Sequence, residues 1–309
     1  MTLSTPTVES PAHPPRHRGR SFLVGLVLLL VMSGLATWGW WFGTIGSIPL
    51  RPHCTTAAAG ATAELTPEQA NNAAVIIGIA SRRGLPPRAA TIAIATALQE
   101  SKLINVTGGD RDSVGLFQQR PSQGWGTAEQ VYDPVYATNA FYDALVEIPG
   151  YEKLSITVAA QRVQRSAFPT AYAAHEPEAR LWASTLTGYT PAGLTCVLTD
   201  ISGENPKEKR GTDHFTGRAR AVKTAARQEL GRTAVPSGGT GAVLRFGAAP
   251  KEPGRQAWTV AQWAVSRAYE LRVTEVQTEG KRWRRDHPAE GWTPKDDGPP
   301  PGEVLVRVG

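Results

Sequence analysis

Three consecutive segments of the chain read AATIAIATALQES (89–101), KLINVTGGDRDSV (102–114) and GLFQQRPSQGWG (115–126). The first segment has no charge from Ala89 to Leu98, and its alanines and isoleucines lie on every side of the helix that they predict. A helix that is apolar all round is buried. Glu100 is the first charge after this run, in the final turn, where the negative end of the helix dipole and the loss of water both favour the neutral acid. A neutral carboxyl group can donate a proton, so Glu100 is a candidate general acid.

The segment after this helix is rich in residues that form turns. It contains two glycines and two aspartates, Gly108, Gly109, Asp110 and Asp112. Glycine adopts backbone conformations that other residues avoid, and aspartate side chains cap turns. We therefore expect the chain to fold back here and to bring residues 113–125 over the end of the helix that carries Glu100.

The pattern of these residues resembles a known superfamily. Glu100-Ser101, followed by a Ser-x-Gly-Leu-x-Gln element at 113–118, resembles the lysozyme-like superfamily that holds soluble lytic transglycosylases and goose-type lysozymes. The longer string, which continues to Gly124-Trp125-Gly126, is similar to membrane-anchored members from actinobacteria. The resemblance extends over residues 70–186 and includes nothing beyond Cys196. It implies a helical lysozyme-like domain that acts on peptidoglycan.

The resemblance also implies roles for individual residues. Glu100 matches the general acid/base that cleaves the MurNAc-GlcNAc glycosidic bond, and Ser113 and Gln118 match residues that line the glycan groove. Arg120 and Trp125 are expected to bound this groove through charge and through stacking on a sugar face. The candidate substrate-binding residues are Ser101, Ser113, Gln118, Gln119, Arg120, Trp125, Gln161 and Gln164.

Two chemistries are open for such a site. A lytic transglycosylase needs one carboxyl group, because the 6-hydroxyl of the sugar itself closes on the anomeric carbon. An inverting muramidase needs a second carboxylate about 6.5–9.5 Å away to activate water. Asp110 and Asp112 are the candidates for that base in the loop after Glu100, and their alternative role is turn capping.

One element of the family pattern is different here. Soluble transglycosylases carry an Ala-Tyr-Asn element whose tyrosine hydrogen-bonds the catalytic glutamate, whereas the corresponding residues 159–164 read AAQRVQ. Gln161, Gln164 or Tyr172 is the candidate replacement. A non-catalytic domain that binds peptidoglycan as a wall scaffold is therefore the alternative to an enzyme. The presence of Glu100 favours the enzyme, and the missing element favours the scaffold.

The N-terminal residues predict a membrane anchor. Residues 1–20 predict a disordered cytoplasmic tail with three arginines, and residues 21–43 have no charge. A hydrocarbon core of about 30 Å needs about 20 helical residues, and the arginines before the span indicate that the N-terminus is inside. We expect a single-pass protein of the cell membrane whose bulk is extracellular and whose residues 21–43 contact the bilayer. A signal peptide cleaved near Gly43 is the alternative.

The chain has two cysteines, Cys54 and Cys196, one at each end of the region that resembles lysozymes. An extracellular location permits a disulfide between them, and free buried thiols are the alternative. In the chain-entropy model a closed loop of this length stabilises the fold by about 5 kcal/mol. Without clustered cysteines and histidines the sequence predicts no metal site. We also expect no cofactor and no nucleic-acid partner.

The domain organisation follows from these segments and from the charge. The sequence predicts a single N-terminal transmembrane helix, an α-helical lysozyme-like domain of five helices over 54–196, a linker over 197–212 and a small α+β domain over 213–309. Residues 203–309 hold 19 Lys and Arg against 13 Asp and Glu, a net charge of +6, whereas residues 54–202 carry −3 and residues 1–53 carry +3. The basic C-terminal domain is a candidate binder of anionic wall polymers or lipid head groups, and a solvated basic surface is the alternative.

Overall fold

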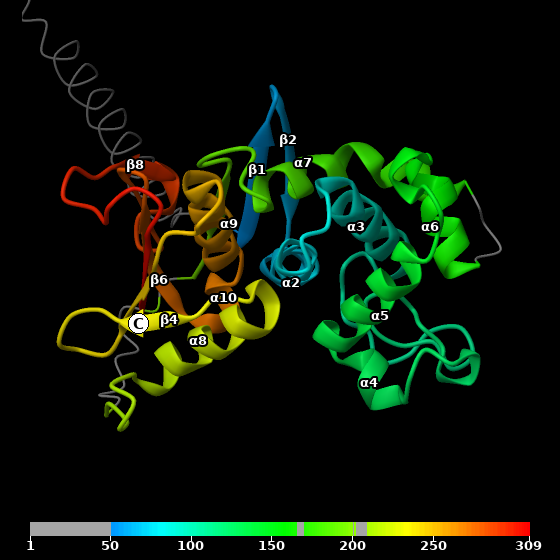
Figure 1. The fold of residues 1–309 in the computed structure, drawn as a ribbon, viewed down its shortest axis with the longest axis horizontal. Coiled ribbons are helices and arrows are strands. Elements are labelled where there is room, and N and C mark those ends of the chain that lie inside the picture. The colour runs from blue at the N-terminus through cyan, green and yellow to red at the C-terminus, as the bar shows by residue number, and fades with distance from the viewer. Residues whose placement is uncertain (1–50, 166–169, 200, 202–208) are drawn as a thin grey trace, which may run out of the picture. The chain divides into compact units, whose positions relative to one another are not determined.

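The structure is a computed structural model that describes residues 51–165, 170–199, 201 and 209–309 (Figure 1). Its helices are α2 (Pro67–Arg82), α3 (Pro87–Ser101), α4 (Ala128–Tyr132), α5 (Pro134–Val146), α6 (Ile156–Gln164), α7 (Glu176–Leu186), α8 (Gly217–Leu230), α9 (Pro253–Ser266) and α10 (Ala268–Leu271). Its strands are β1 (His53–Ala58), β2 (Ala61–Leu65), β3 (Leu194–Val197), β4 (Ala234–Pro236), β5 (Val243–Phe246), β6 (Val273–Thr278), β7 (Lys281–Arg284), β8 (Trp292–Pro294) and β9 (Val304–Val308). Short 3-10 helices are η1 (Pro121–Gln123), η2 (Tyr151–Lys153), η3 (Ala171–His175) and η4 (Pro288–Glu290).

Helix α2 lies where the N-terminal and C-terminal halves of the described chain meet. It begins at a capping box, in which the Thr66 hydroxyl accepts the Gln69 N–H and the Gln69 side chain accepts the Thr66 N–H. Every residue from Asn72 to Ala80 is buried, so the helix has packing partners on all sides. Helices α3 and α5 contact it from one half, and α8 and α9 from the other. The contact is close: a Cβ atom on Gly78 would lie 3.2 Å from Leu230.

A three-stranded antiparallel sheet in the order β2-β1-β3 joins the two ends of the first half. Strands β1 and β2 form a hairpin that turns at Ala59 and Gly60, both with positive φ, as two-residue hairpin turns require. Cys54 on β1 is paired with Cys196 on β3, and a disulfide joins them. The predicted disulfide is confirmed. The two cysteines are separated by 142 positions in the sequence, and the bond closes the loop between them.

The fold class predicted from the sequence is wrong. Residues 54–196 are not all helical, because strands β1, β2 and β3 form a sheet at their two ends. The central strand β1 finds one of its partners far along the chain, and sequence periodicity within a short window does not predict such a pairing. Residues 51–309 form one compact unit of mixed helices and sheets. The predicted linker 197–212 lies partly outside the described residues, and the domain boundaries stay a prediction.

A six-stranded antiparallel sheet in the order β4-β5-β9-β6-β7-β8 makes up much of the C-terminal half (Figure 1). Strands β6 and β7 form a hairpin that turns at Glu279 and Gly280, both with positive φ. Val276, Trp283 and Val306 are buried on one face of this sheet, and helix α9 contacts β6 and β9. Because side chains alternate between the two faces of a strand, the neighbouring residues of β6, β7 and β9 lie on the other face.

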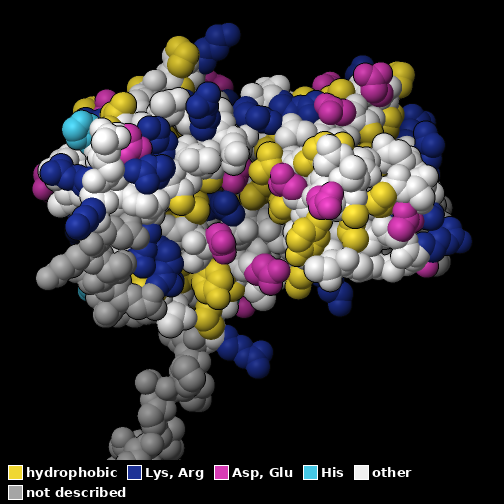
Figure 2. Space-filling view, turned by 90° about the horizontal axis from the view of Figure 1, so that it is seen from below, with side chains coloured by type: hydrophobic (Ala, Val, Ile, Leu, Met, Phe, Trp, Pro, Cys, Tyr) yellow, Lys and Arg dark blue, Asp and Glu magenta, His cyan; other side chains and the backbone are white. Residues whose placement is uncertain are grey.

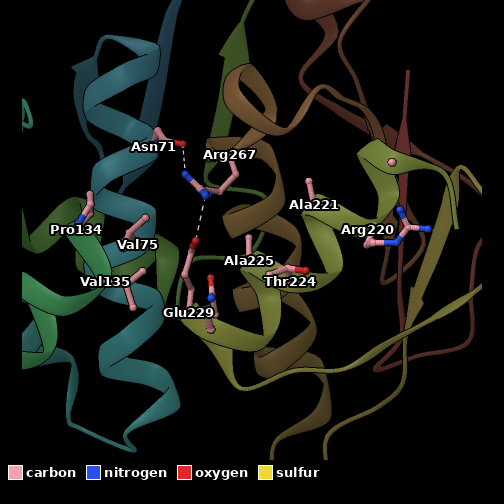
Figure 3. Close-up of a pocket in the computed structure, with 12 residues that line it drawn as sticks. Asn71, Val75, Pro134, Val135, Arg220, Ala221, Thr224, Ala225, Glu229 and Arg267 are labelled. Atoms are coloured by element: carbon pink, nitrogen blue, oxygen red, sulfur yellow. Dashed lines mark hydrogen bonds and ion pairs between the residues drawn. The ribbon is translucent and has the colours of Figure 1, made fainter. Parts of the chain in front are cut away.

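A buried polar cluster joins α2, α8 and α9 at the base of a groove of about 570 Å³ (Figure 3). The Arg267 guanidinium donates to Glu229 Oε1 at 3.0 Å and also to Asn71 Oδ1. The Trp263 indole N–H donates to Glu229 Oε2 at 2.7 Å. Burial raises the pKa of Glu229, and the charge of Arg267 and the Trp263 hydrogen bond oppose this effect. The cluster ties together three helices that are far apart in sequence.

The membrane prediction falls outside the part of the chain that the structure describes. The predicted tail 1–20 and the predicted membrane-spanning helix 21–43 both lie outside the described residues. Within the described ranges, no helix is both long enough and apolar enough to cross a bilayer.

Candidate active site

Glu100 lies in the last turn of α3, as the sequence predicted, and its side chain is partly exposed. The helix ends at once, because Lys102 and Leu103 both have positive φ, 56° and 58°. The Lys102 N–H donates to Leu98 O at 3.0 Å, and the Leu103 N–H donates to Ala97 O at 3.0 Å. These bonds satisfy carbonyl groups that a helix end otherwise leaves open, so the position of Glu100 is well defined.

A buried tyrosine holds the Glu100 carboxylate. The Tyr172 hydroxyl donates a hydrogen bond of 2.6 Å to Glu100 Oε1, and the Tyr172 ring is fully buried. Tyr172 belongs to η3, which packs against α3. In the same contact the His175 Nε2 lies 3.1 Å from Gln99 Oε1, and burial lowers the pKa of His175. Of the three candidate partners for Glu100, the structure brings Tyr172 to its carboxylate.

The Gly-Leu-Phe-Gln loop is fixed beside Glu100 by two side chains. Ser101 Oγ lies 2.7 Å from Leu116 O, and the Gln164 amide donates to Phe117 O at 2.7 Å. Leu116 and Phe117 are themselves buried in the core. Ser101 and Gln164 were predicted as substrate-binding residues, and the structure gives each of them a hydrogen bond that positions this loop.

Backbone conformation and side-chain hydrogen bonds fix the remaining residues of the loop. Gln118 has φ 49° and its amide donates to Gly115 O at 3.1 Å. Gly115 has φ 80°, and a Cβ there would lie 2.4 Å from Val131 O, so only glycine fits. The Ser113 side chain is buried. Gln119 is 2% exposed and donates to Ala137 O at 3.1 Å, which places it in the packing against α5.

The two aspartates of the loop have different surroundings. Asp112 accepts hydrogen bonds from the Ser122 N–H at 2.8 Å and from the Ser122 hydroxyl at 3.0 Å, and Arg120 Nε lies 2.8 Å from its carboxylate. These donors hold the pKa of Asp112 well below its usual range, with the Ser122 backbone bond the largest cause. The Asp110 side chain is 91% exposed, with Arg111 Nε 3.9 Å away. Asp112 therefore holds the segment at Arg120 and Ser122 against the loop after Glu100.

A groove of about 670 Å³ brings together two of the predicted substrate-binding residues, Trp125 and Gln164. Arg162 and Arg165 of the α6 end line it on one side, and Glu147 lines it after α5. The Trp125 ring is partly buried against the core and partly open to the groove. Gln161 lies one turn before Arg165 on α6, on a partly buried face. The groove thus offers an aromatic face, amides and guanidinium groups to a bound molecule.

The contact between His175 and Gln99 was not predicted from the sequence. His175 carried no signal, because a single histidine before a helix is common in any fold.

No protein-family model matches the sequence, and no curated protein matches it either. Among the residues that the structure describes, no group of three or more His, Cys, Asp and Glu could hold a metal ion.

Proposed function

We propose that this protein is an extracytoplasmic peptidoglycan-cleaving enzyme of the lysozyme-like type, with Glu100 as the general acid/base. The observation that carries the proposal is the 2.6 Å hydrogen bond from the Tyr172 hydroxyl to Glu100. In the family that the sequence resembles, a tyrosine also bonds the catalytic glutamate, although from another place in the sequence. The disulfide between Cys54 and Cys196 supports an oxidising location outside the cytoplasm.

The proposed reaction is that of a lytic transglycosylase. Glu100, as the neutral acid, gives its proton to the glycosidic oxygen while the bond from that oxygen to C1 of MurNAc breaks. The 6-hydroxyl of the same MurNAc forms the new bond to C1, and its proton passes to the Glu100 carboxylate. The product has a 1,6-anhydro end, the acid is restored, and Tyr172 keeps the carboxyl group oriented throughout. No water molecule is consumed.

The surroundings of Asp112 favour this chemistry over an inverting muramidase. A general base must accept a proton from water, and a carboxylate whose pKa is held far below its usual range is a poor base. The oxygens of Asp112 are also occupied by Arg120 and Ser122. Asp110 remains the alternative base, and the products distinguish the two chemistries.

The proposal is tested with purified peptidoglycan and the variant Glu100→Gln. Glutamine keeps the shape and the hydrogen bond from Tyr172 but cannot donate the proton, and loss of general acid catalysis lowers rates about 10²- to 10⁴-fold. Released muropeptides are measured by mass spectrometry, which separates 1,6-anhydro ends from reducing ends. We expect 1,6-anhydro ends from the natural protein.

The control is Glu152→Gln, which changes an exposed glutamate of η2 and removes the same charge. Its rate should equal that of the natural protein. Full activity in a folded Glu100→Gln protein would refute Glu100 as the general acid, whereas peptidoglycan binding without any release by the natural protein would leave the wall scaffold. Reducing ends that disappear in Asp110→Asn would replace the transglycosylase by the muramidase.

A further inference from the structure

The turn that follows Glu100 has an unfavourable backbone and is buried. Lys102 and Leu103 have positive φ, 56° and 58°, which residues with a Cβ atom rarely adopt in succession. Leu103 is 0% exposed. Such a conformation persists only where the surrounding structure holds it. The contacts that hold this turn therefore also fix the end of the helix that carries Glu100.

Two amide side chains of α2 hold this turn. Gln69 Nε2 donates to Lys102 O, and Asn72 Nδ2 donates to Leu103 O, both at 2.8 Å. The two carbonyl groups lie beyond Ser101, the last residue of α3, so the hydrogen bonds of the helix do not include them. Asn72 is 4% exposed, so water competes little for its bond. The turn is therefore fixed by side chains of α2.

The direction of the Asn72 amide is set by its neighbours. An amide group donates from its nitrogen and accepts at its oxygen, so turning it over would point an oxygen at the Leu103 carbonyl. Asn71 Nδ2 donates to Asn72 Oδ1 at 3.3 Å, and this bond leaves the Asn72 nitrogen for Leu103 O. The Arg267 guanidinium in turn donates to Asn71 Oδ1 (Figure 3). Because arginine can only donate, Arg267 determines which end of each amide faces the turn.

Arg267 is itself held in the core. It is 9% exposed, and it donates to Glu229 Oε1 at 3.0 Å. Hydrogen bonds therefore connect five residues in the order Glu229, Arg267, Asn71, Asn72 and Leu103. This hydrogen-bond chain begins on α8, in the C-terminal half of the described residues, and ends at the turn after Glu100. A buried polar network of this kind specifies one arrangement of the groups that it joins.

We propose that Asn72 is a positioning residue for Glu100 and that Asn71 and Arg267 orient it. The proposal rests on the proposed function of Glu100 as the general acid/base. Asn72 holds the turn, the turn fixes the end of α3, and Glu100 keeps one position relative to a bound glycan. A displacement of about 1 Å at a reacting group can lower a rate about 100-fold. The C-terminal half thus contributes to the reaction by position, without contact with the bond that breaks.

The test uses Asn72→Asp and Asn71→Asp, because aspartate keeps the shape of asparagine and, when ionised, cannot donate. Asn72→Asp removes the donor to Leu103 O, and Asn71→Asp keeps the bond from Arg267 but removes the donor to Asn72. We expect kcat for muropeptide release at pH 7 to fall about 10-fold in Asn72→Asp and severalfold in Asn71→Asp, with KM within about twofold of the natural protein. A loss of stability alone would instead reduce the fraction of folded protein and leave the kcat of that fraction unchanged.

A second measurement does not depend on activity. The carbon NMR signal of the Glu100 carboxyl group reports its place beside the Tyr172 ring and hydroxyl, and the variant Glu100→Gln identifies that signal by its loss. We expect the signal to shift or to broaden in Asn72→Asp, and to a smaller degree in Asn71→Asp. If the natural protein releases no muropeptides, the proposed function fails, and this signal still decides whether Asn72 positions Glu100.

The matched control is Asn139→Asp on α5. Arg82 Nη2 donates to Asn139 Oδ1 at 2.8 Å, and Asn139 Nδ2 donates to Val135 O at 2.7 Å, so this amide is also held by one donor and one acceptor. Charged side chains of both signs lie on the face of the molecule shown in Figure 2, and the control adds the same single charge as each test variant. Its kcat and its Glu100 signal should match those of the natural protein.

Equal changes in Asn139→Asp and Asn72→Asp would overturn the proposal, because the added charge alone would then explain them. An unchanged Glu100 signal in folded Asn72→Asp would overturn it as well. Circular dichroism shows that each variant is folded. If Asn72→Asp does not fold, Asn71→Asp decides, since the Asn71 side chain is only partly buried, and a Glu100 signal that stays unchanged in it contradicts the proposal.

Discussion

Glu100 and Glu229 have similar positions on their helices, and we assign different roles to them. Each is the penultimate residue of its helix, α3 or α8, and each accepts a hydrogen bond from a buried aromatic side chain. The bonds are 2.6 Å from the Tyr172 hydroxyl and 2.7 Å from the Trp263 indole. Glu229, however, is 2% exposed and paired with Arg267, whereas Glu100 is partly exposed.

The difference distinguishes a structural carboxylate from the one that we propose to be reactive. Helix position and an aromatic donor are common to both glutamates. Glu229 is buried in an ion pair with Arg267, whereas Glu100 forms no ion pair within the described residues. A carboxylate that is fixed by one neutral donor and open to solvent can exchange its proton with a ligand. One that is neutralised by a buried arginine holds helices together.

The largest effect is expected for the free energy of unfolding when the buried Glu229 loses its partner. Replacement of Arg267 by methionine leaves Glu229 buried without its cation, and breaking a buried pair in this way costs about 3–5 kcal/mol of folding free energy. Denaturant unfolding measures it. Arg180→Met removes the exposed partner of Glu176 on α7, and it should cost about 0–1 kcal/mol. Equal losses in the two variants would remove the distinction between the buried pair and the surface pair.

The second prediction concerns the hydrogen bond from Tyr172 to Glu100. Tyr172→Phe removes one hydrogen bond to a group that is charged during the proposed reaction, and such bonds contribute about 1.5–3 kcal/mol. We expect the rate of muropeptide release to fall about 10- to 100-fold with little change in unfolding free energy. A variant that loses stability and keeps its rate would make Tyr172 a packing residue.

A smaller effect is expected at Ser101. Ser101→Ala removes the hydroxyl that lies 2.7 Å from Leu116 O, and a neutral hydrogen bond contributes about 1 kcal/mol. Because this bond positions the loop beside Glu100, we expect the rate to fall severalfold while the pH profile of the rate stays the same. A changed pH profile would mean that Ser101 acts on the proton and not on the loop.

The smallest effect is expected at Asp112, whose carboxylate forms an ion pair with Arg120 at the surface. Its folded pKa is lowered, so its contribution to stability is present above pH of about 4, the ordinary pKa of aspartate, and is lost as pH falls below that value. Asp112→Asn should therefore lower the melting temperature slightly at pH 7 and by less at pH 2. A large loss of catalytic rate in this variant would restore Asp112 as a base.

Local signals in the sequence predicted individual elements but not the fold class. The buried helix whose last turn holds Glu100 depends on adjacent residues, and it is present. Strands β1 and β3 were missed because their pairing joins residues far apart in the sequence. The alanines of β1 also weaken its strand signal.

The candidate site shows the same limit: local features were predicted from the sequence, and contacts between distant segments were not. The sequence identified Glu100 and the loop that lies beside it, because one helix and the turn after it place both. It left three candidates for the residue that bonds Glu100, since the packing of η3 on α3 decides between them. It also gave Gln119 a substrate-binding role, although the backbone of α5 takes up its side chain.

The covalent link from Cys54 to Cys196 also sets the path of mechanical force through the protein. If the chain is pulled between residue 51 and residue 309, tension passes along the backbone to Cys54, crosses to Cys196 and continues toward the C-terminus. Residues 55–195, which include Glu100, Tyr172 and the groove, are then outside the loaded path. The part of the molecule proposed to hold the glycan can thus keep its geometry while the rest bears the load.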